Sequence, residues 1–159
     1  MCRRLLMLTA VGLAALATVL VTSLAAAATP PLGVHFDVPT TLPPDGGPTF
    51  GPFTATGPAV DAGLICPKGD TIDVFSKASG FQSNRGVNFQ VVKHFTCADG
   101  SGEFDAKLQV RIDPKGDNFN WAIVGGTLAY ERLHGTGQGI GEYAQYGVLD
   151  LYDGQVHVD

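Results

Sequence analysis

The sequence predicts an all-β domain, an antiparallel barrel of eight short strands, and three observations support this prediction. Apolar and polar residues alternate with a period of two in several segments, which is the pattern of half-buried strands. Glycine, asparagine and aspartate separate these segments at spacings typical of hairpins. Glycine also occupies every second position from 135 to 141, and closing a sheet needs the local coiling that glycine permits. A two-sheet sandwich is the alternative architecture.

The first 28 residues have the pattern of a secretory signal peptide. Arg3 and Arg4 precede an uncharged apolar run that ends at Leu24, and alanines at 26–28 supply the small residues of a cleavage site. We therefore expect a secreted, extracellular protein with no membrane contact after cleavage. An uncleaved anchor is the alternative, because the apolar run is long.

Net charge argues against nucleic acid as a partner. The chain has 10 basic and 15 acidic residues, and cleavage after residue 28 would leave 8 and 15, a formal charge of −7. Nucleic acids and anionic membrane surfaces bind clusters of lysine and arginine, which this chain lacks. The four histidines share no ligand spacing, so neither a metal nor a cofactor is expected.

Two cysteines, Cys66 and Cys97, remain after cleavage. An even pair in an exported chain predicts a disulfide, and a catalytic cysteine is the alternative. Closing this loop would stabilise the fold by about 3–4 kcal/mol on the chain-entropy model.

Proline content divides the remaining chain. Eight of the ten prolines lie between Pro30 and Pro58, so residues 29–48 are predicted to be an extended leader or linker, and residues 49–159 the barrel domain. The leader could instead lie across the domain and use Val34, Phe36 and Val38 as anchors. Strands are expected, in order, at 53–57, 60–65, 71–79, 87–97, 103–113, 119–124, 137–146 and 148–153, with one helical turn within 129–134.

The segment 121–139 resembles the signature of the allene oxide cyclase and dirigent superfamily. Its apolar strand from Trp121 leads into Gly125-Gly126-Thr127, followed by Tyr130 and then Gly135-Thr136-Gly137. Leu128 departs from the pattern, since the family more often has glycine there. The resemblance implies a calycin-like barrel with an open cavity, often trimeric. It also implies the confinement and orientation of a reactive apolar substrate during cyclisation or stereoselective coupling.

Several residues are candidates for a site of this kind. The glycine-lined strand face leaves room for an indole or a ligand, and Trp121, Tyr130 and Tyr143 could bind an apolar or aromatic small molecule; ordinary core packing is the alternative. Lys93 interrupts an apolar strand face and Glu142 adjoins the glycines, so both are candidates for proton transfer. A bulge at Val91-Val92 would turn Lys93 outward instead. The two functional hypotheses are a cyclase-like cavity protein and a non-catalytic secreted binding or surface module.

Overall fold

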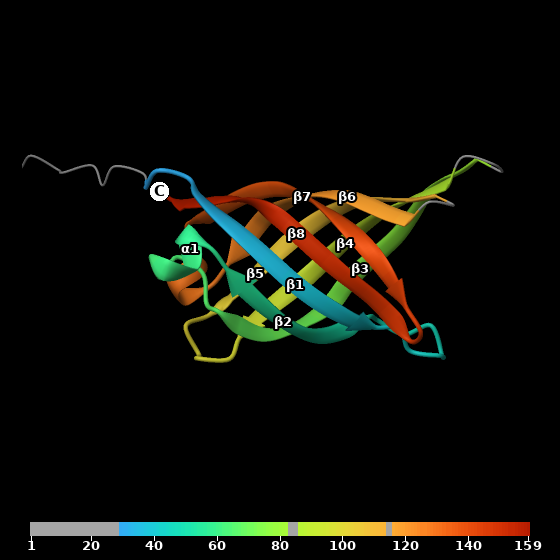
Figure 1. Ribbon diagram of the computed structural model, residues 1–159, viewed down its shortest axis with the longest axis horizontal. Coiled ribbons are helices and arrows are strands. Elements are labelled where there is room, and N and C mark those ends of the chain that lie inside the picture. Colours follow the sequence, from blue (N-terminus) through green and yellow to red (C-terminus); the bar gives the residue numbers. More distant parts are fainter. Residues whose placement is uncertain (1–28, 83–85, 114–115) are drawn as a thin grey trace, which may run out of the picture.

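The computed structural model describes residues 29–82, 86–113 and 116–159; the predicted signal peptide, 1–28, lies outside them. The chain folds into a closed barrel of antiparallel strands (Figure 1). The strands are β1 (Leu32–Thr41), β2 (Phe50–Thr56), β3 (Lys68–Gln82), β4 (Gly86–Cys97), β5 (Glu103–Asp113), β6 (Gly116–Gly126), β7 (Leu133–Ala144) and β8 (Gly147–Val158). Two short helices, α1 (Pro58–Asp61) and η1 (Leu128–Tyr130), complete the described elements.

Pairing between the first and last strands closes the barrel. Each strand pairs with the next one along the chain, and β1 pairs with β8 from Leu32↔Val156 to Thr41↔Gly147. This closure confirms the predicted eight-stranded antiparallel barrel and excludes the sandwich. Among the described strands it also leaves no free sheet edge, which would otherwise be open to pairing with other chains.

The strand β1 lies within the predicted leader, 29–48, so that prediction is wrong for residues 32–41. The side chains of Val34, Phe36 and Val38 point inward and are at most 4 % exposed. Pro39 is accommodated because it is exposed and lies where pairing with β2 is interrupted, between Asp37↔Thr54 and Thr41↔Phe50. The high proline content favoured a linker, although Val34, Phe36 and Val38 alternate as in a strand with one buried face.

The predicted strand at 60–65 is also wrong, because this segment begins in α1. Pro58 starts the helix, where its missing N–H needs no partner, and the N–H of Ala62 bonds to the carbonyl of Pro58. Ala59 and Ile65 are buried against the barrel, at 0 % and 2 % exposure. The helix α1 lies at one end of the barrel, which we call the α1 end (Figure 1).

Aromatic rings fill the barrel from the α1 end to its middle. Phe36 lies at their centre, with ring centroids of five neighbours within 6.2 Å. Offset and edge-to-face contacts of this kind add to the stabilisation from burying apolar area. This aromatic cluster comprises Phe36, Phe53, Phe95, Phe104, Phe119, Trp121, Tyr130 and Tyr152.

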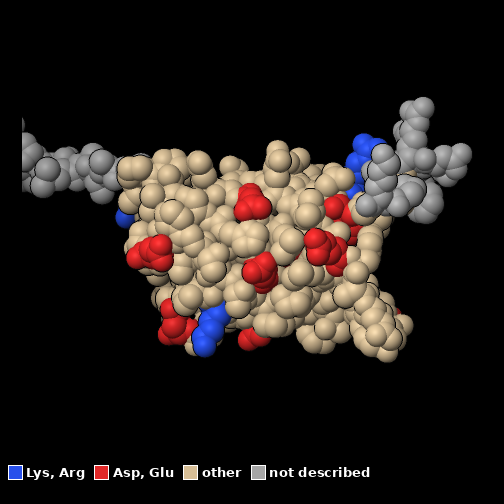
Figure 2. Space-filling model, in the orientation of Figure 1, with Lys and Arg blue, Asp and Glu red and all other residues tan. Residues whose placement is uncertain are grey.

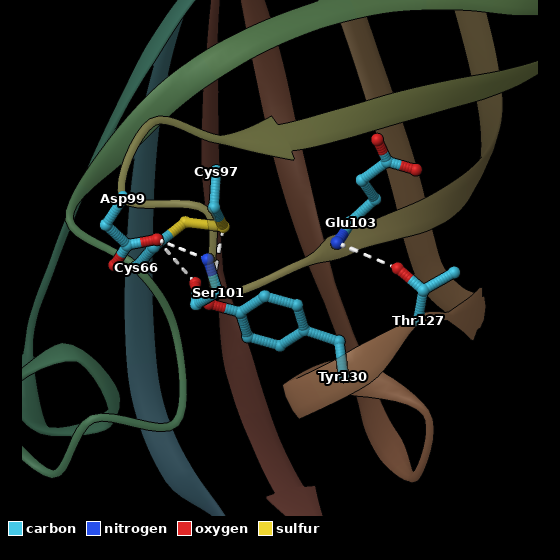
Figure 3. The surroundings of a disulfide bond; sticks show 7 residues. All are labelled: Cys66, Cys97, Asp99, Ser101, Glu103, Thr127 and Tyr130. Carbon is cyan, nitrogen blue, oxygen red and sulfur yellow. Dashed lines mark hydrogen bonds between the residues drawn. A yellow bond between two sulfur atoms is a disulfide. The ribbon is translucent and has the colours of Figure 1, made fainter.

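The predicted disulfide between Cys66 and Cys97 is present at the α1 end (Figure 3). It joins the segment before β3 to the end of β4, with Cα atoms 6.0 Å apart. The hydroxyl of Tyr130 lies 3.3 Å from Sγ of Cys97 and 2.7 Å from Oγ of Ser101. The bond therefore belongs to the packed end of the barrel, together with η1.

On the face shown in Figure 2, acidic side chains lie at several separate places and basic side chains are visible near the edges. Among the described residues, no helix is long and apolar enough to cross a membrane.

We expect the double variant Cys66→Ala/Cys97→Ala to lose about 3–4 kcal/mol of unfolding free energy, because its unfolded chain regains the entropy of an open loop. Urea denaturation followed by Trp121 fluorescence measures the loss. Wild-type protein treated with reductant is the control and should lose a similar amount. A loss below about 1 kcal/mol in both samples would contradict the structural role of the bond.

Candidate functional site

The glycine face of β7 points into the barrel, and aromatic rings of the same chain cover it. A Cβ atom at Gly137 would lie 2.7 Å from Cε2 of Trp121, and one at Gly139 would lie 2.2 Å from Cζ of Phe119. Across the β7–β8 pair, a Cβ at Gly154 would lie 2.4 Å from Cζ2 of Trp121. The space that the sequence left open is therefore filled by an indole and a phenyl ring.

The three predicted ligand-binding residues do not share a cavity. Trp121 is 3 % exposed, and its Nε1 donates a hydrogen bond to the carbonyl of Gln138 at 3.2 Å. Tyr130 is buried in η1 at the α1 end. Tyr143 is 59 % exposed near the opposite end, where its hydroxyl donates to Asp117. Core packing accounts for the first two side chains.

Lys93, in contrast, points into the barrel. The register between β4 and β5 runs without interruption from Val87↔Ile112 to Thr96↔Glu103, so β4 has no bulge at Val91-Val92 against β5. The irregularity lies on β3, between Asp73 and Phe75. Lys93 is consequently 2 % exposed, on the inner face.

Two carboxylates surround the Lys93 ammonium, and we call Asp73, Lys93 and Asp150 the interior charged cluster. Nζ of Lys93 lies 2.8 Å from Oδ1 of Asp73 and 3.8 Å from Oδ2 of Asp150. The first contact is an ion pair without regular hydrogen-bond geometry, and the hydroxyl of Thr49 donates to the other oxygen of Asp73. The hydroxyl of Tyr152 is buried and has no hydrogen-bond partner among the described residues.

Burial gives Asp150 an unusual proton affinity. Desolvation raises the pKa of its carboxyl to about 7, although the positive charge of Lys93 opposes the shift; the negative charges of Asp73 and Asp117 add to it. Burial likewise raises the pKa of the Tyr152 hydroxyl, as do the charges of Asp150 and Asp73. Near neutral pH, Asp150 can therefore act as an acid or as a base.

A cavity of about 170 Å³ adjoins this cluster at the end of the barrel opposite α1. Its volume is below the ~300–1,000 Å³ of typical ligand sites, so it fits a small molecule or one end of a larger one. The lining is apolar around a charged patch: Phe89, Val91, Leu108, Val110, Ile112, Phe119 and Val148 face Thr40, Asp73, Lys93, Asp117 and Asp150.

The remaining proton-transfer candidate, Glu142, lies elsewhere. Its side chain is exposed, and it alternates with the inward-facing Gly141 along β7. The structure therefore does not bring Glu142 to Lys93. Among the described residues, no group of three or more His, Cys, Asp and Glu side chains is arranged to hold a metal ion.

Sequence reasoning missed Asp73, Asp150 and Tyr152. The alternation Val148, Asp150, Tyr152 on β8 could have shown that an acid shares the buried face with an aromatic residue. Asp73 offered no such signal, because the irregularity next to it shifts the register of β3.

Comparisons with protein-family models, curated proteins and solved structures found no match for this chain.

We expect Gly139→Ala to lower the unfolding free energy by about 1–3 kcal/mol, because the added methyl group would collide with the ring of Phe119. Gly125→Ala is the matched control: a Cβ there meets no atom within 4 Å, and its stability should stay within about 0.5 kcal/mol of wild type. Thermal or urea unfolding measures both. Equal stabilities would contradict the close approach of β7 to the aromatic cluster.

The raised pKa of Asp150 predicts a specific pH dependence of stability. Between pH 4 and 7 the unfolded chain releases this proton while the folded chain retains it, so the Asp150 contribution becomes less favourable as pH rises. Asp150→Asn should therefore gain stability relative to wild type across this window. The gain should be at most about 4 kcal/mol, the equivalent of three pKa units.

Urea denaturation at pH 4.5, 6 and 7.5 tests this expectation. Glu142→Gln removes an exposed carboxyl and serves as the control. Its unfolding free energy should differ from that of wild type by less than that of Asp150→Asn does. A stability difference between Asp150→Asn and wild type that is constant over the window would refute the burial argument.

Proposed function

We propose that the protein is an exported barrel that binds a small, mainly apolar molecule in the cavity at the end opposite α1 and moves a proton on it. The observation that carries this proposal is the position of the Asp150 carboxyl, 3.8 Å from Nζ of Lys93 in an apolar-lined cavity, where burial raises its pKa to about 7. A general acid–base group is most effective when its pKa lies near the working pH. The disulfide supports export, since such bonds persist in oxidising compartments.

The cluster suits an isomerisation or cyclisation. Asp150 would take a proton from one carbon of the ligand and return it at another position, so no atom or electron is gained or lost overall. The positive charge of Lys93 would stabilise negative charge that develops on a ligand oxygen. Asp73 would hold Lys93 in place through their 2.8 Å contact.

The resemblance to the allene oxide cyclase and dirigent superfamily supports the same class of chemistry. Leu128, which stands where that family more often has glycine, adopts a left-handed backbone with φ of 54°. The turn thus has the conformation that glycine favours, in spite of the substitution. Stereoselective coupling would need an oxidant from outside to generate radicals, and the barrel would then contribute orientation alone.

A non-catalytic binding module is the second proposal. The observation in its favour is the aromatic cluster, which packs the interior from the α1 end to the middle, beside a cavity of only about 170 Å³. The family resemblance also implies a trimer, and the exposed pair Phe50↔Ile72 on β2 and β3 would be covered by such an assembly.

Titration with β-ionone, linoleic acid and coniferyl alcohol tests binding, with Trp121 fluorescence as the readout. We expect a saturable change with at least one of these probes. Val148→Phe should fill the cavity and weaken binding at least tenfold, whereas Val124→Phe, on the exposed outer wall, should leave it unchanged. No response to any probe would refute the cavity function.

Deuterium uptake by β-ionone in D₂O, followed by mass spectrometry, tests proton transfer. Asp150→Asn should retain binding and lose about 10²-fold or more of the exchange rate. Binding without exchange in the wild type, or equal exchange in both proteins, would leave the binding module as the function.

A further inference from the structure

A wide groove lies on the outside of the barrel. It is a groove of about 710 Å³ that crosses the wall from β4 over β5 to β8 and reaches β1. Its centre is the outer face of the β7 segment whose inner face carries the glycines, because Gln138 and Ile140 alternate with Gly137 and Gly139.

Gly137 and Gly139 lie in the wall behind this groove. They allow the β7 backbone to lie directly against the rings of Trp121 and Phe119, closer than any residue with a Cβ could.

A row of hydrogen-bonding side chains crosses the groove, one from each of β5, β6, β7, β8 and β1. Register pairs connect Gln109 to Asn120, Asn120 to Gln138, Gln138 to Asp153, and Asp153 to His35. Adjacent members are separated by the strand spacing of about 4.8 Å. Within the described part of the chain, the side-chain amides of Gln109, Asn120 and Gln138 make no hydrogen bond, so their donors and acceptors remain available.

Charge is nearly balanced in the groove. Arg111 contributes a positive charge at one side and Asp153 a negative charge at the other. Nδ1 of His35 lies 2.8 Å from Asp153, and its Nε2 lies 3.2 Å from Asp37. The carboxylate of Asp153 therefore already contacts the His35 ring. The whole chain carries a formal charge of −5, which disfavours an anionic partner.

We propose that this groove binds a neutral oligosaccharide that runs across the strands. Each sugar hydroxyl is both donor and acceptor, as is each primary amide of the row. The strand spacing is close to the repeat length of one sugar unit in an extended oligosaccharide, so successive sugars would meet successive amides. The apolar side chains of Ile140 and Leu151 lie side by side on β7 and β8 and would contact the C–H faces of the rings.

Isothermal titration with cellohexaose, maltohexaose and hexagalacturonate tests the proposal on the disulfide-bonded protein. We expect binding of at least one neutral hexasaccharide, and none of the anionic one. Asn120→Ala/Gln138→Ala should weaken this binding at least tenfold, because both changed side chains are exposed and central in the row. Gln145→Ala removes an exposed amide outside the groove and should change affinity less than twofold.

Three results would overturn the proposal. The first is no heat of binding with either neutral hexasaccharide at millimolar concentration, and the second is equal binding of hexagalacturonate. The third is a molar mass by light scattering that falls from oligomer to monomer in the Asn120→Ala/Gln138→Ala variant, since the groove would then be a contact between copies of this chain. Val148→Phe should bind the oligosaccharide like wild type, which separates this site from the interior cavity.

Discussion

Every other feature of this fold depends on the pairing of β1 with β8. The ten residues of β1 complete the hydrogen-bonding ladder and convert an open sheet, with two exposed edges, into a continuous wall. They also carry Phe36 to the centre of the aromatic cluster and Thr40 to the cavity at the other end. The protein thus gains its closed interior from a segment whose composition is typical of a linker.

The interior is divided between two kinds of packing. Aromatic rings fill the α1 end and the middle, and the disulfide ties this end to the segment before β3. At the opposite end, smaller apolar side chains leave a cavity and a lysine faces two aspartates. One half therefore stabilises the fold, and the other half contains the side chains that could take part in acid–base chemistry.

Charges inside an apolar barrel are expensive to desolvate, so their presence needs a physical explanation. Lys93 and Asp73 offset part of this cost by pairing, and Asp150 avoids the rest by holding its proton up to about neutral pH. The hydroxyl of Tyr152, which has no hydrogen-bond partner in the described part of the chain, borders the same cluster. A purely structural interior would gain by replacing these groups with hydrophobic residues, which is why we place the proposed chemistry here.

The sequence by itself determined the all-β class, the strands from β3 to β8 to within a few residues, and the disulfide, because period-two alternation, turn residues and cysteine pairing are local signals. The predicted number of strands was also eight, but one of them was placed at 60–65, where there is no strand, and β1 was not predicted. Only the tertiary structure decided that β1 closes the barrel and that Lys93 points inward beside Asp73 and Asp150. It also decided that rings of the same chain cover the glycines of β7. These outcomes depend on register between distant strands and on which side chain fills a shared volume, and neither is encoded in the spacing of residues along one segment.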